Sequence, residues 1–149
     1  MSNLAFSVSA NVTTAATKTM VTLTSTAAIT PKIPSMLFSA SAAPADQVTQ
    51  FQLKRFTAPG TNTAYVPRPR GNNANVAAAI AGFNNSVEPT YGGVTPEAQF
   101  SLNQRATFQL IFVPGMEIWL PPTANNGVAI FSNAVSTGYA ADFTIDYLE

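Results

Sequence analysis

The 149-residue sequence contains no cysteine and no histidine. It therefore has no thiol or imidazole nucleophile, no imidazole general base, no disulfide framework, and none of the zinc, iron–sulfur or haem-attachment sites that these side chains form. Charge is equally scarce, because only 9% of the residues are charged, against about 25% in ordinary soluble domains. The seven basic and seven acidic side chains give a net charge of zero. We expect no enzymatic activity and no cofactor or metal, and the chain offers no basic face to nucleic acid or an anionic membrane.

Long apolar runs are also missing. A membrane-spanning helix needs about 20 consecutive apolar residues, and no such run exists. The longest charge-free stretch, 118–141, is interrupted by Pro121-Pro122 and by Asn125-Asn126-Gly127, which predicts strands and turns. The first residues contain neither a basic head nor a compact apolar segment, so we expect no secretory signal and a start in the cytoplasm.

Neutral polar residues supply the surface instead. Ser, Thr, Asn and Gln together account for 47 residues, about a third of the chain. A surface that is coated with hydroxyl and amide groups but has no net charge tends to associate. This composition is typical of a protein whose surface is covered by neighbouring proteins in an assembly.

The apolar residues recur mostly with a period of two, which indicates half-buried strands. The clearest case is the C-terminal segment, in which Tyr139, Ala141, Phe143, Ile145 and Tyr147 face one way and Asp142, Thr144 and Asp146 face the other. The pattern predicts strands over 19–27, 33–41, 47–57, 99–103, 106–113, 116–120, 128–132 and 139–148, with a twist or bulge in 47–57. These short strands between Pro, Gly and Asn turns predict an all-β, jelly-roll-like antiparallel sandwich of about eight strands over residues 18–149.

Two segments do not fit this regular pattern. Residues 58–98 are rich in turn residues and predict one long irregular loop that is functional or contacts partners. Within it only 63–66 and 76–81 are expected to be locally ordered, and 76–81 is equally consistent with helix and strand. Residues 1–17 are either the first strand or an extended arm that adds to a neighbour's sheet, and we favour the arm. Leu4, Phe6 and Val8 would then bind that neighbour.

The acidic residues are dispersed. Asp142 and Asp146 share one face of the last predicted strand, but about 13 Å separates them along it, which is too far for direct cooperation. A cross-strand partner such as Glu117 would close the gap and form a calcium site or a catalytic pair. The preferred interpretation is a solvated outer face, with no catalytic residue.

Three further residues are candidates for partner binding. Arg68 and Arg70 form an Arg-Pro-Arg sequence in the proline-rich segment, which is either a solvated loop or a site for a phosphate or a carboxylate on a protein partner. The preferred interpretation of Trp119 is that its side chain packs in the core or in an interface. The alternative is a sugar-stacking platform, although Tyr65 and Tyr91 lie in separate predicted elements.

One resemblance to known proteins is visible in the sequence. It lies in Asn103-Gln104-Arg105-Ala106-Thr107, Pro114-Gly115, Ile118, Leu120-Pro121 and 123–128 (TANNGV), and in the earlier segments 21–40 and 45–61. Through these segments, which are spread over most of the chain, the sequence resembles small structural proteins of tailed double-stranded DNA phages.

The resemblance implies a virion component, a jelly-roll capsid decoration (cement) protein on the outside of the head shell. Its partner would be the major capsid protein, whose neighbouring subunits it would bridge. We expect a homo-oligomer, a trimer rather than a dimer, although both remain open. The alternatives are a β-sandwich head or tail fibre module that binds host glycans and, less favoured, a small glycan-processing enzyme.

Overall fold

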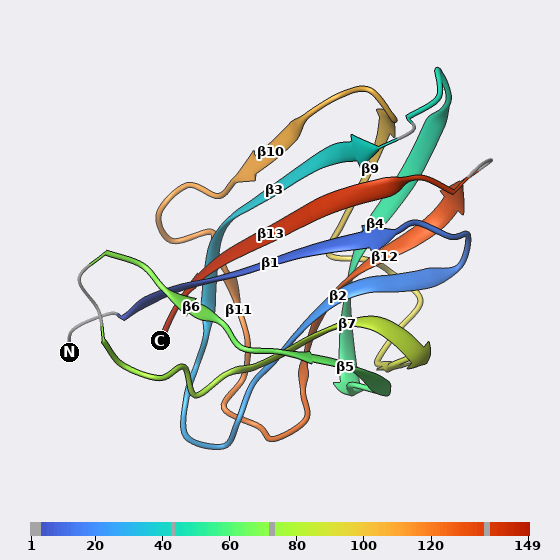
Figure 1. Cartoon of the computed structure of the whole chain (residues 1–149). Helices are drawn as coiled ribbons and strands as arrows, with labels where there is room; N and C mark the ends of the chain where they lie inside the picture. The colour runs from blue at the N-terminus through green and yellow to red at the C-terminus, as the bar shows by residue number, and fades with distance from the viewer. Residues whose placement is uncertain (1–3, 43, 72–73, 136–137) are drawn as a thin grey trace.

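The computed structural model describes residues 4–42, 44–71, 74–135 and 138–149, and in these residues every regular element is a β-strand. One antiparallel sheet, the β13 sheet, has the order β10-β3-β13-β1-β6, with β11 also paired to β3 (Figure 1). Its strands are β1 (Ala5–Thr13), β3 (Lys32–Ala42), β6 (Arg68–Pro69), β10 (Phe108–Ile111), β11 (Ile118–Trp119) and β13 (Ala140–Leu148).

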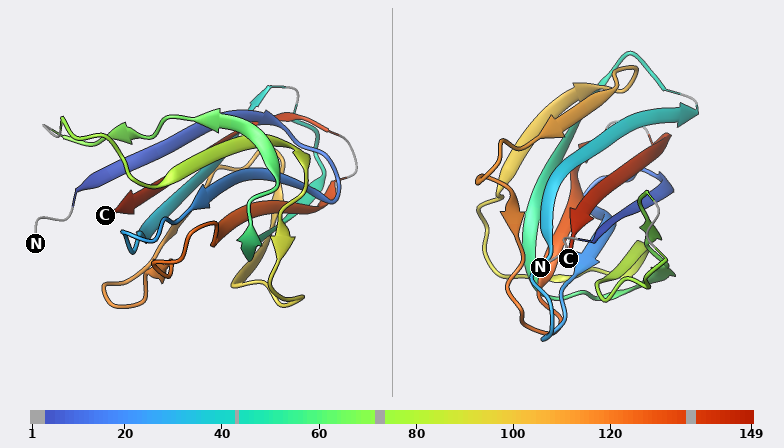
Figure 2. Two further views of the ribbon diagram at one scale, coloured as in Figure 1. Left: turned by 90° about the horizontal axis from the view of Figure 1, so that it is seen from below. Right: turned by 90° about the vertical axis from the view of Figure 1, so that its left-hand side faces the viewer.

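The second antiparallel sheet, the β12 sheet, packs against the first (Figure 2). It has the order β5-β7-β2-β12-β4-β8, and β9 also pairs with β4. Its strands are β2 (Lys18–Thr24), β4 (Val48–Ala58), β5 (Thr61–Tyr65), β7 (Ile80–Val87), β8 (Thr90–Tyr91), β9 (Ala98–Asn103) and β12 (Gly127–Val135).

The order in which the chain visits the sheets is that of a jelly roll. Strands β1, β3, β10 and β13 belong to one sheet, and β2, β4, β9 and β12 belong to the other. The last two strands insert between early ones, because β13 pairs with both β1 and β3 while β12 pairs with both β2 and β4. Two interleaved sets of four strands of this kind make the double Greek key of a jelly roll, which confirms the predicted fold class.

The core lies between the two sheets. The predicted alternation at the C-terminus is confirmed, since Ala141, Phe143, Ile145 and Tyr147 on β13 are each at most 1% exposed. Phe143 contacts Phe38 on β3 and Phe51 on β4, with ring centroids 5.0 and 5.6 Å apart, and so joins the two sheets. Burial of such rings is the main favourable term for this fold.

The prediction of one long loop over 58–98 is wrong, although the local order expected at 63–66 falls largely within strand β5. This segment contains β5, β6, β7 and β8 and leads directly into β9, although residues 72 and 73 lie outside the described residues. The helix considered for 76–81 is absent, and β7 begins at Ile80 instead. The turn residues separate several short strands, and a two-residue strand such as β6 has too few positions to show a period of two.

The prediction of an N-terminal arm is also wrong for the described residues. β1 lies between β13 and β6, and its register with β13 runs from Ala5 opposite Leu148 to Thr13 opposite Ala140. Phe6 and Val8 are fully buried, and Leu4 exchanges two backbone hydrogen bonds with Glu149. These side chains are therefore part of the core and its margin instead of a partner-binding segment. Residues 1–3 of the predicted arm lie outside the described residues.

Strand β2 is buried on both faces, where the alternation predicted one solvated face. Thr22 and Thr24 point away from Val21 and Leu23, yet they are at most 3% exposed. For Thr22 the cover comes from a close approach at Gly82, with which it pairs in the neighbouring strand β7. A side chain at position 82 would overlap Asn62 of β5, whose Nδ2 lies 3.3 Å from Thr22 Oγ1. Glycine thus allows β5 to cover this part of the β12 sheet.

Two other observations relate to the expectations from sequence. The predicted irregularity in the third strand is confirmed, since the pairing of β4 with β8 shifts register between Phe56 and Ala58. Among the described residues, no helix is both long and apolar enough to cross a membrane.

Candidate interaction surface

The outer face of the β13 sheet, turned away from the core, is polar. Its side chains form cross-strand rows because β3, β13 and β1 run in register across the sheet. The rows are Ser35, Asp146, Ser7 and Arg68; Leu37, Thr144 and Ser9; and Ser39, Asp142 and Asn11. Most of these groups are hydroxyls or amides, so this face offers many hydrogen-bonding groups and little net charge.

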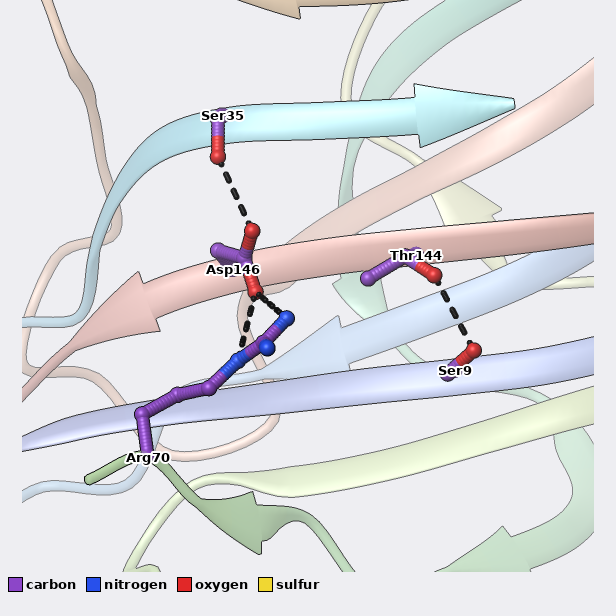
Figure 3. Close-up of polar contacts among 5 residues, drawn as sticks. All are labelled: Ser9, Ser35, Arg70, Thr144 and Asp146. Carbon is purple, nitrogen blue, oxygen red and sulfur yellow. Dashed lines mark hydrogen bonds and ion pairs between the residues drawn. The ribbon is translucent and has the colours of Figure 1, made fainter.

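Asp146 links its own strand, β13, to β3 and to Arg70, the residue that follows β6 (Figure 3). Its Oδ2 accepts a hydrogen bond from Ser35 Oγ of β3 at 3.0 Å, and its Oδ1 lies 2.6 Å from an Nη of Arg70. The backbone N–H of Arg70 also donates to Ala5 O at 2.8 Å, next to the end of β6. The backbone hydrogen bond therefore holds the β6 segment to β1, and the ion pair holds it to β13. The side chains are 53% and 33% exposed, so the pair is worth at most about 1 kcal/mol.

The second carboxylate of the face has different partners. Asp142 Oδ1 accepts from Asn11 Nδ2 at 2.7 Å, and the same amide donates to Ser41 Oγ at 2.6 Å. Glu117 lies in the turn before β11, where it accepts the Gly115 N–H at 2.8 Å. The pKa of the Glu117 carboxyl group is lowered, mainly by the hydrogen bond from the backbone N–H of Glu117 itself. Within the described residues, no three acidic side chains gather where they would hold a metal ion.

The Arg-Pro-Arg sequence lies on a strand, β6, and the two arginines differ. Arg70 pairs with Asp146 of the same chain, so its guanidinium is already engaged. Arg68 pairs through its backbone with Ser7 and is exposed on the outer face of the β13 sheet. No ion pair with Arg68 occurs among the described residues. Of the two, Arg68 is the one available to a partner.

Trp119 is 47% exposed at the edge of the β13 sheet. The ammonium of Lys32 lies 4.0 Å from the centroid of its ring, a cation–π contact, and its carbonyl accepts from Arg55 at 2.9 Å. The other two aromatic residues considered for a sugar platform have ring contacts of their own. Tyr65 packs on Phe83 and Tyr91 packs on Phe131, so neither ring stacks beside Trp119.

The outer face of the β12 sheet contains a cluster that the sequence analysis missed. The Glu88 carboxylate accepts the N–H and the hydroxyl of Thr19, and the Tyr91 hydroxyl also contacts the Thr19 hydroxyl. Lys54 Nζ lies 4.2 Å from the Tyr91 ring and 4.7 Å from the Phe131 ring. Burial, followed by the charge of Glu88, raises the Tyr91 pKa to about 12, although the Thr19 hydrogen bond opposes this. The cluster fastens the β7–β8 connection across β2, which no local sequence signal reveals.

The side of the sandwich formed by β9 and β10 is apolar, and this surface was also missed. The Phe100 and Phe108 rings stack with centroids 4.7 Å apart between the two sheet edges, and both remain partly exposed. Behind them lies a small cavity of about 10 Å³ that is lined only by apolar residues. The available signal was the near absence of charge, since Arg105 is the one charged residue between Glu97 and Glu117.

Comparison of the chain with family models, with curated proteins and with solved structures identifies no match. The surfaces described above and the composition of the chain are therefore the features that indicate its function.

Proposed function

We propose that the protein is a non-enzymatic virion component that decorates the outside of a phage capsid and bridges neighbouring major capsid subunits. The observation that carries this proposal is the outer face of the β13 sheet, with its rows of serine, threonine and asparagine. A face of this kind, whose hydroxyl and amide groups outnumber its charged groups and whose charges sum to zero, forms many hydrogen bonds with another protein, and two of its charges, Arg70 and Asp146, already pair with each other. The jelly-roll connectivity supports the proposal only as an analogy with other viral capsid proteins.

The mechanism would be additive. Each copy contributes one modest interface, in which exposed hydroxyl and amide groups such as those of Ser9 and Asn11 contact the shell. A capsid repeats that interface by symmetry. The many copies together therefore oppose the separation of shell subunits more strongly than one interface could. Arg68 adds one charge for a carboxylate on the shell.

Cryo-microscopy of the phage particle tests the proposal. We expect density for the sandwich on the outside of the head, with the outer face of the β13 sheet against the shell. Density on the tail alone would refute it.

The glycan-binding alternative is supported by one feature, the half-exposed indole of Trp119. A glycan array separates the two functions. The decoration function predicts no bound glycan for the wild-type chain, whereas binding that disappears in Trp119→Ala would favour the alternative.

A further inference from the structure

Strand β10 is an open edge of the β13 sheet (Figure 1). It pairs with β3 on one side and with no described strand on the other. The N–H of Phe112, just after β10, donates to Pro34 O at 2.9 Å. Because backbone groups alternate in direction along an antiparallel strand, Phe108 and Leu110 also point to β3, whereas Gln109 and Ile111 present their N–H and C=O groups to the open side.

This edge is short, but it lacks three of the features that normally prevent a strand from pairing with another chain. Such edges are usually protected by charge, by proline or by a bulge. Residues 106–113, which include β10, contain no charged residue and no proline, and the β10–β3 register is regular. The opposite edge of the same sheet differs, since β6 carries Arg68 and Pro69 and follows Pro67.

The surroundings of the edge are apolar and exposed. Ile111, Val113 and Met116 are 66%, 59% and 70% exposed, and Leu37, diagonally opposite Ile111 on β3, is 39% exposed. The partly buried Phe108 lies beside them on the inner side of the strand. A surface that combines free backbone groups with exposed apolar side chains is suited to strand addition.

We propose that β10 pairs with β10 of a second copy of the chain, antiparallel about a twofold axis at Leu110. In this register, Gln109 of each copy lies opposite Ile111 of the other. Those two residues point outward, so the pairing forms four backbone hydrogen bonds. The occupant is a second copy because the edge supplies both halves of the contact. It is uncharged, so two copies do not repel each other, and the twofold closes the assembly at a dimer.

The dimer would join the two β13 sheets into one continuous sheet. Its two polar outer faces would then lie side by side, which suits a protein that bridges two subunits of a shell. This inference selects the dimer over the trimer that the sequence analysis preferred. It concerns the purified chain, so it stands or fails independently of the capsid function.

Light scattering of the purified full-length chain measures the assembly directly. We expect a dimer that persists in about 1 M NaCl, where the screening length is about 3 Å, because the interface contains no ion pair. A monomer or a trimer at concentrations of tens of micromolar would overturn the proposal.

A proline substitution locates the interface. Gln109→Pro removes an outward N–H and leaves the bonds to β3 intact. We expect the dimer dissociation constant to rise about 30-fold, since two hydrogen bonds are lost across the twofold. The matched control Gln109→Ala keeps the N–H and should remain dimeric. An unchanged dimer in Gln109→Pro would refute the β10 interface.

A second variant guards against failure to fold. Ile111→Lys places a charge on the exposed side of the edge, at a side chain that is 66% exposed. We expect a monomer whose circular dichroism matches that of the wild type. A folded Ile111→Lys variant that still forms the wild-type dimer would contradict the proposal as well.

Discussion

Arg70 and Asp146 form an ion pair, with nitrogen and oxygen 2.6 Å apart. Asp146 lies on β13 and Arg70 directly follows β6, so the pair spans strand β1, which lies between β13 and β6. The pair crosses over Ser7, which is opposite Asp146 on one side and opposite Arg68 on the other. This contact positions the β6 segment, and with it the exposed Arg68.

A double-mutant cycle tests the strength of this pair. Because both side chains are partly exposed, we expect a coupling energy of about 0.5–1 kcal/mol between Arg70→Ala and Asp146→Ala, measured by urea unfolding. The coupling should fall in high salt. Asp142→Ala with Arg70→Ala is the matched control, and its coupling should be close to zero.

Gly127 tests the packing at the centre of the β12 sheet. It lies between β2 and β4, and a Cβ atom there would overlap the Leu23 carbonyl oxygen and the Phe56 ring. Gly127→Ala should destabilise the fold by about 1–3 kcal/mol in urea unfolding, as overpacked substitutions do. Gly93→Ala, where no atom lies within 4 Å of the added carbon, should change stability little. Equal effects of the two variants would contradict the packing described here.

Titration of the Tyr91 phenol should lower the stability of the fold in alkali. Its folded-state pKa is about 12, above the ordinary value of 10, so the unfolded chain loses the phenol proton first as pH rises. The contribution of the neutral phenol is complete below about pH 10 and declines between about 10 and 12. Tyr91→Phe should therefore show a shallower decline in unfolding free energy over this window than the wild type. An identical decline in both proteins would show that Tyr91 titrates normally.

Glu149 should protect backbone amides of the segment before β7 from hydrogen exchange. Its carboxylate accepts the backbone N–H groups of Ala78 and Ala79 at 3.0 and 2.7 Å. Glu149→Ala should accelerate hydrogen exchange at these two amides and cost about 1–2 kcal/mol of stability. Glu149→Gln keeps one acceptor oxygen, so its amide exchange rates and its stability should lie between those of the wild type and Glu149→Ala. Unchanged exchange in Glu149→Ala would exclude this role.

The regular half of the fold was predictable because its strands are long enough for a period of two to appear. β13 is the best example, since every second side chain from Tyr139 to Tyr147 is buried as the alternation predicts. The turn residues also placed most strand boundaries in the second half of the chain. β10 and β11 are shorter than predicted but lie within the expected ranges.

The candidate surfaces were less predictable. Phe6 and Val8 have the same pattern whether β1 adds to a neighbouring chain or to its own sheet, because alternation does not identify the partner strand. The Arg70–Asp146 pair joins residues that are 76 positions apart in sequence. The exposure of Ile111 at an open edge follows from which strand lies at the end of the sheet.

The sequence by itself determined that this chain folds as β-strands, that thiol and imidazole chemistry are absent, and that its surface is neutral and polar. These properties follow from composition and local alternation, which act on each segment separately. Only the tertiary structure decided that β1 is an internal strand, that β2 is covered on both faces, and that β10 is left open. The physical reason is that backbone hydrogen bonds between strands do not depend on the side chains, so the choice of neighbours follows from how all the apolar faces are buried together.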